Sequence, residues 1–95
     1  MKKVYSFAIG VIDPFADRKS AKKALDFIKA LPGLAAVHPD LNYTILCFDT
    51  LDHAVQAHEK YVATGNDAGY YIMSAEISDD NQTLTVQGPA KDCRN

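Results

Sequence analysis

Three histidines and two cysteines are the residues of this chain with the widest chemical range. His53 and His58 lie in a segment with helical periodicity, and their five-residue spacing places them about 140° apart around a helix. They therefore cannot hold one metal ion as an i, i+4 pair does. His58 falls on the apolar stripe of that segment, so we expect a buried histidine with its hydrogen bonds satisfied. His38 lies in a turn and has no acidic or thiol partner at ligand spacing.

The other residues that support catalysis do not form a recognisable arrangement. Cys47, Asp49 and His53 flank one predicted strand-to-helix junction, and they are the one set that could assemble into a site. No serine lies in a nucleophile-elbow sequence, and neither cysteine belongs to a catalytic motif with histidine. The loop that ends in Arg18–Ser20 lacks the second glycine of a phosphate-binding loop. We therefore expect no catalytic residue, no metal site and no cofactor.

Length and composition predict one folded domain that comprises residues 1–95. The chain has 95 residues, of which 47% are hydrophobic and 23% charged, as is ordinary for globular proteins. We expect the tail from about residue 88 to be flexible. The formal charge of −2 argues against binding that depends on neutralising nucleic-acid phosphates. Two cysteines without a disulfide pattern, and no segment long enough to span a bilayer, predict a cytoplasmic protein without a membrane partner.

The hydrophobic periods along the chain predict a ferredoxin-like β-α-β-β-α-β order followed by an extra C-terminal strand. Period-2 patterns mark strands at 4–12, 34–37, 42–48, 70–77 and 83–86, and period-3.6 patterns mark helices at about 21–31 and 51–62. In this α+β architecture a four-stranded antiparallel sheet carries both helices on one face. The first and third strands are expected at its centre, and its opposite face is expected to be open.

The alternation of side chains assigns residues to the two faces of this sheet. The large residues of the first strand are predicted to face the helices, which leaves Ser6 and Ala8 on the open face. In the C-terminal hairpin, Met73, Ala75 and Ile77 are expected to face the helices as well. The open face is then a shallow apolar trough, and on a small domain such a surface usually contacts a partner. We predict that the contact residues are Tyr43, Ile45, Cys47, Tyr70 and Ile72.

The segment Asn42–Phe48, together with Ala54 and Ala57, resembles the corresponding part of RNA-recognition motif domains. The resemblance covers about a quarter of the chain and implies a related fold. In that family two aromatic residues of this strand stack on bases. Tyr43 matches one of these positions, whereas Ile45 occupies the other. Because no lysine or arginine occurs between positions 34 and 59, we expect no nucleic-acid partner.

These observations predict a small non-catalytic domain that binds a protein partner, or a second copy of itself, through the open sheet face. Two alternatives remain. One is an inhibitor or adaptor that acts on a larger host protein, as compact phage and mobile-element proteins often do. The other is a dimeric small-molecule-binding domain or enzyme, with a pocket between the sheets that is lined by Tyr43, Tyr70, His38 or His53.

Overall fold

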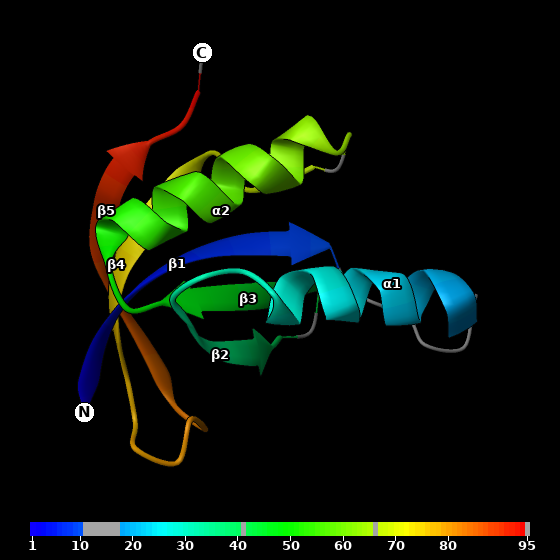
Figure 1. The fold of residues 1–95 in the computed structure, drawn as a ribbon. Coiled ribbons are helices and arrows are strands. Elements are labelled where there is room, and N and C mark those ends of the chain that lie inside the picture. The colour runs from blue at the N-terminus through cyan, green and yellow to red at the C-terminus, as the bar shows by residue number, and fades with distance from the viewer. Residues whose placement is uncertain (11–17, 41, 66, 95) are drawn as a thin grey trace.

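The described part of the chain forms an α+β structure with two helices and one five-stranded antiparallel sheet (Figure 1). The computed structural model describes residues 1–10, 18–40, 42–65 and 67–94. Neither described helix has the length and hydropathy needed to cross a bilayer. The elements are, in chain order, β1 (Lys2–Gly10), α1 (Arg18–Lys29), β2 (Leu34–Pro39), β3 (Tyr43–Phe48), α2 (Leu51–Ala63), β4 (Tyr71–Ile77) and β5 (Leu84–Asp92).

Strand β1 lies in the middle of the sheet, whose order is β2-β3-β1-β4-β5. It pairs antiparallel with β3 on one side and with β4 on the other, so that Ser6 lies opposite both Cys47 and Met73. Paired residues in an antiparallel sheet point to the same side. These registers therefore determine which residues of all the strands share a face.

The last strand is longer than the sequence pattern indicates. We expected it to end at residue 86 and the chain to be flexible from about residue 88, but β5 continues to Asp92. Its pairing with β4 includes Met73 opposite Pro89 and Tyr71 opposite Asp92, with two register shifts along the ladder. A proline that lacks an N–H is tolerated here because β5 is an edge strand. At the other end of the chain, positions 11 and 12 of the predicted first strand lie outside the described residues.

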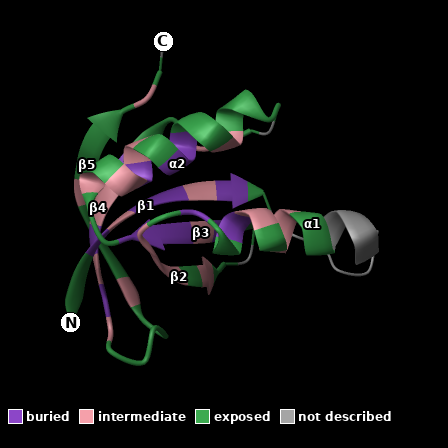
Figure 2. Ribbon diagram, viewed as in Figure 1, coloured by how far each residue is buried: buried purple, intermediate pink, exposed green. Residues whose placement is uncertain are grey.

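The main core lies between the helices and the sheet. Phe7 of β1 and Phe48 of β3 stack with ring centroids 5.6 Å apart and an interplanar angle of 11°. Figure 2 shows buried residues on the central strands and on the inner sides of both helices. Small side chains let α2 approach the sheet closely. The fully or nearly buried members of this core are Phe7, Ile9, Ile28, Leu31, Leu46, Phe48, Ala54, Ala57 and Ile72.

A second core lies on the sheet side opposite the helices. Val4, Cys47, Ala75 and Ile77 are each at most 1% exposed there. Leu84 of β5 packs against them, as do partly buried residues of β2 and β3. The face that we expected to be open is therefore partly covered by the chain's own C-terminal hairpin.

The predicted facing of β4 is wrong by one residue. Ile72 is fully buried in the core beneath the helices, whereas Met73 and Ala75 pair with Ser6 and Val4 on the opposite side. A one-residue slip exchanges the two faces of a strand. Met73, Ala75 and Ile77 lie on the side of the second core, and not on the side of the helices as expected. The polar positions of β4 lie on the helix side, where Glu76 pairs with polar residues of both neighbouring strands.

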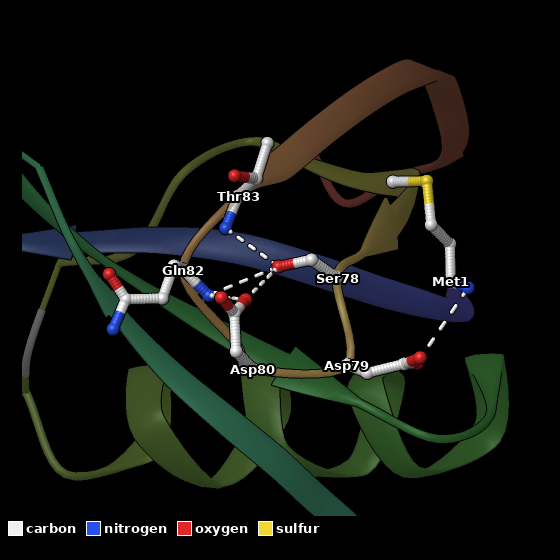
Figure 3. Close-up of polar contacts among 6 residues, drawn as sticks. All are labelled: Met1, Ser78, Asp79, Asp80, Gln82 and Thr83. Atoms are coloured by element: carbon white, nitrogen blue, oxygen red, sulfur yellow. Dashed lines mark hydrogen bonds and ion pairs between the residues drawn. The ribbon is translucent and has the colours of Figure 1, made fainter.

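A hydrogen-bonded turn joins β4 to β5 and accounts for the acidic pair that the sequence places there (Figure 3). The Ser78 hydroxyl donates to Asp80 Oδ1 at 2.6 Å and accepts from the Thr83 N–H at 2.9 Å. The neighbouring Asp79 carboxylate lies 3.7 Å from the amino group of Met1. Asn81 has a φ of 62°, which asparagine tolerates better than most residues. These carboxylates therefore serve the turn and the chain terminus.

The facing of β4 can be tested by shortening Ile72, which lies beneath the helices, and comparing the loss of stability with that at an exposed valine. Ile72→Ala removes three carbon atoms from a fully buried site, so we expect it to lower the free energy of unfolding by about 2–5 kcal/mol. Val62→Ala, at a position of α2 that is 48% exposed, is the control and should change it by about 0.5 kcal/mol or less. Chemical denaturation followed by circular dichroism measures both values. Equal losses would contradict the observed facing.

Candidate functional site

The candidate site is the sheet side opposite the helices, which we call the concave face. It is defined by the strand registers, because paired residues share a side. All five strands contribute to it. Its residues are Lys2, Val4, Ser6, Ala8, Gly10, Ala36, His38, Tyr43, Ile45, Cys47, Tyr71, Met73, Ala75, Ile77, Leu84, Val86, Pro89 and Asp92.

A hollow of about 490 Å³ occupies part of the concave face. Ser6 and Ala8 of β1 are its small central residues, and their short side chains leave the space unfilled. Larger apolar side chains surround them. These are Ile45 of β3, Met73 of β4, and Leu84 and Val86 of β5. The hollow exists because the middle strand is small where its neighbours on both sides are large.

Polar groups lie along one part of the hollow. His38 and Asp40, at the end of β2, and Tyr71, at the start of β4, line it. His38 Nδ1 is buried and has no hydrogen-bond partner among the residues that the structure describes. Buried polar atoms almost always have a partner, so an orphaned one calls for an explanation. The guanidinium of Arg94 lies 5.1 Å from the Tyr71 ring centroid and pairs with Asp92.

The predicted contact residues do not all meet on this surface. Tyr43 lies on the concave face and is 53% exposed, and Ile45 lines the hollow. Cys47 belongs to the same face but is fully buried in the second core, where burial raises its thiol pKa to about 11. Tyr70 lies just before β4, is largely exposed and lines the end of the hollow. Ile72 lies beneath the helices, on the opposite side of the sheet.

Several residues that line the hollow were not predicted from the sequence to lie on this face. Met73 was assigned to the helix side, and Tyr71 follows the same alternation. Leu84 and Val86 were recognised as strand residues but were given no face. The signal for all four was present as period-2 apolar positions in the hairpin. The periodicity does not show that the side of the sheet opposite the helices also carries a core.

Cys47, Asp49 and His53 do not assemble into one site. His53 Nδ1 lies 2.7 Å from Asp49 Oδ1, while the Cys47 side chain packs in the second core. The Asp49 and His53 side chains close over Gly33, where a Cβ would collide with both. Gly33 also has a φ of 78° and accepts a hydrogen bond from the Asp49 N–H at 2.9 Å. The pair thus secures the loop before β2 against the start of α2.

His58 has a structural role, as expected from its place on the apolar stripe. It is 8% exposed, and its Nε2 donates to the carbonyl oxygen of Gly69 at 2.8 Å. Its ring lies edge-on to Phe7, with centroids 5.0 Å apart. No group of three or more metal-ligating side chains occurs among the described residues.

A second hollow, of about 810 Å³, lies between α2 and the C-terminal end of β5. Its lining mixes apolar positions such as Val55 with charged residues of both signs, among them Glu59 and Lys91. This surface is larger than the hollow of the concave face but has no apolar wall contributed by several strands. Tyr70 is common to both.

The concave face is equipped for binding. Apolar walls around small residues can bury an apolar group. No protein-family model, no curated protein and no solved structure significantly matches the chain. The geometry of the concave face therefore carries the functional conclusion.

Replacement by leucine should cost much more stability at His58, in helix α2, than at His38, in strand β2. His58→Leu leaves the Gly69 carbonyl without its donor, and we expect the free energy of unfolding to fall by about 1–3 kcal/mol. His38→Leu removes a ring nitrogen that has no partner among the described residues, and it should lower the free energy of unfolding by no more than about 0.5 kcal/mol. Urea denaturation of both variants measures the difference. A larger loss for His38→Leu would show that His38 is hydrogen-bonded in solution.

The Asp49–His53 pair should contribute to stability above the range in which aspartate titrates. The hydrogen bond from His53 holds the Asp49 pKa below its ordinary value. A carboxyl group whose pKa is lower in the folded state stabilises the fold above its unfolded pKa of about 3.9, and this contribution is lost as the pH falls through the folded pKa. Asp49→Asn should therefore flatten the dependence of unfolding free energy on pH between about pH 5 and pH 2.

The matched control for this experiment is Asp26→Asn, which removes one exposed carboxylate from α1. Thermal unfolding across the pH series gives both profiles. If Asp49→Asn and the wild type lose stability in parallel as the pH falls, then the ion pair has no role in acid stability.

Proposed function

We propose that this chain is a small non-catalytic protein-interaction domain that forms a homodimer through its concave face. The observation that carries this proposal is the exposed apolar rim around the hollow. Val86 is 52% exposed, Tyr43 is 53% exposed and Tyr71 is 38% exposed, and all three belong to this face. Covering these large apolar side chains with a partner lowers the free energy, because it removes their apolar surface from water.

The size of the concave face suits a dimer. A sheet of five strands of six to nine residues, with strands about 4.8 Å apart and about 3.3 Å per residue, presents a projected area of roughly 600 Å². The accessible surface of a hollowed face exceeds its projection. A stable interface buries about 800 Å² on each partner. Close to the whole concave face would thus be used.

A second copy is the simplest occupant. Two identical concave faces related by a two-fold axis form an isologous interface, which is the commonest arrangement in homo-oligomers. In such a pair, the exposed rim side chains of one copy can enter the hollow of the other. Val86 and Tyr43 come from strands on opposite sides of β1, and so they offer two separate contacts.

We further propose that the fold belongs to the ferredoxin-like superfold, with β5 as an addition. The order of β2, β3, β1 and β4, their antiparallel pairing and a core shared with both helices support this placement. Fold alone does not identify a function. A reducing compartment such as the cytoplasm fits the two free cysteines, one of which is buried in the second core.

A charge at the rim of the concave face should separate the copies without unfolding them. We expect Val86→Glu to raise the dimer dissociation constant by at least tenfold, because the carboxylate would be buried at the interface. Val62→Glu is the matched control, since Val62 is 48% exposed and lies on α2, on the other side of the sheet. Light scattering on a sizing column, across a concentration series, measures the mass of each variant.

A monomeric wild type at all concentrations would contradict the dimer. The concave face would then be available to a foreign protein, as in the inhibitor or adaptor alternative. A dimer that Val62→Glu weakens as strongly as Val86→Glu would instead place the interface elsewhere. Circular dichroism spectra of both variants establish that each remains folded.

A further inference from the structure

We infer that the hollow between α2 and the C-terminal end of β5 is a binding site for a small organic monocation, an amine or quaternary ammonium compound with an apolar body. The hollow has a volume of about 810 Å³, within the range of roughly 300–1,000 Å³ that is usual for small-molecule sites. Of its described lining residues, Asp92 alone also belongs to the concave face. The inference therefore goes beyond the proposed dimer and does not depend on it.

Hydrogen bonds fix the loop at the end of this hollow. The Gly69 N–H donates to the Ala8 carbonyl oxygen at 2.8 Å, and the Gly69 carbonyl oxygen accepts from His58 Nε2 at 2.8 Å. The Cys93 N–H donates to the Tyr70 carbonyl oxygen at 2.7 Å. These bonds tie the loop to β1, to α2 and to the chain that follows β5. The walls are thus held in place before a ligand arrives, which lowers the cost of binding.

Apolar side chains line the hollow from α2 and from the loop before β4. Val62 is 48% exposed and Tyr70 is 67% exposed. Val55, Ala63 and Ala68 also contribute to the lining. The apolar body of a ligand would remove part of this surface from water, which is favourable. The face of an exposed tyrosine ring also attracts organic cations.

The charges of the lining favour a cation over an anion. The guanidinium of Arg94 and the carboxylate of Asp92 lie 2.7 Å apart and neutralise each other. The other charged lining residues that the structure describes are two carboxylates, Glu59 and Asp67, and one ammonium, Lys91. Neither Glu59 nor Asp67 forms an ion pair with any described residue. An organic cation would supply the missing positive charge.

Cys93 adds no negative charge to this surface. Burial raises the pKa of its thiol, so the thiol stays protonated at neutral pH. The charges of Glu59 and Lys91 both act on this thiol, which shows that the two groups approach it from opposite walls, α2 and β5. Lys91 thus offsets one carboxylate at most. The preference for a cation rests on the presence of two, Glu59 and Asp67.

A pair of probes that share a naphthylmethyl group tests this inference. Naphthylmethylamine carries one positive charge at neutral pH, and naphthylacetate carries one negative charge. Titration of each probe into the isotope-labelled protein, followed by two-dimensional NMR, gives the dissociation constant and identifies the residues that respond. We expect the amine to bind about threefold or more tightly at low salt, with shifts at lining residues such as Val62 and Ala68. High salt should reduce this preference.

Removing the two carboxylates should remove the preference. We expect Glu59→Gln combined with Asp67→Asn to weaken binding of the amine by about threefold or more and to abolish its advantage over the acetate. The matched control combines Glu76→Gln with Asp26→Asn. It removes the same two charges from β4 and α1, at positions that line neither hollow.

Placing an ammonium in the hollow should have the same effect. Ala63→Lys adds one at an exposed lining position of α2, and we expect the affinity for the amine to fall by about threefold or more. Ala30→Lys is the control, since Ala30 is exposed after α1 and lines neither hollow. Circular dichroism spectra establish that each variant remains folded.

The outcomes separate this inference from the proposed dimer. Equal binding of the two probes, no response to either, or shifts confined to residues outside the lining would overturn the ligand site. So would equal losses in the Glu76→Gln, Asp26→Asn control, because the effect would then come from net charge alone. A wild type that is monomeric by light scattering overturns the dimer and leaves this site standing, since one copy supplies all of its walls.

Discussion

Strand β1 has a core on each of its two sides, and the rest of the structure depends on this arrangement. Phe7 and Ile9 anchor the helices on one side, while Val4 anchors the second core on the other. The same strand pairs with β3 and with β4, so its alternation sets the register of the whole sheet. A slip of one residue would exchange the side chains of β1 between the two cores. The register of the middle strand is therefore strongly specified.

The small residues of β1 leave part of the concave face unpacked. Ser6 and Ala8 lie on the concave face between the larger side chains of β3, β4 and β5. They contribute little apolar surface of their own, and they leave the hollow unfilled. The second core is thus incomplete at one end, with exposed Val86 at its margin. In the proposed dimer, a second copy would complete this core.

Asp49, His53 and His58 have structural roles in the fold. His58 supports the connection before β4 through the Gly69 carbonyl, and Asp49 with His53 closes over Gly33. These side chains therefore hold loops in place within the fold.

The order of helices and strands followed from local periodicity, because apolar residues at every second or every third to fourth position reflect burial of one side of each element. His58 on its apolar stripe was predicted on the same basis. The place of Ile45 on the concave side of β3 was predicted from the resemblance to RNA-recognition motif domains. The facing of β4 and the length of β5 were not predicted correctly. An alternating pattern shows that a strand has an apolar side, but when both sides of a sheet carry cores it does not show which side faces the helices. Long-range pairing with β1 decided that question, and so placed Ile72 beneath the helices and Met73 in the hollow.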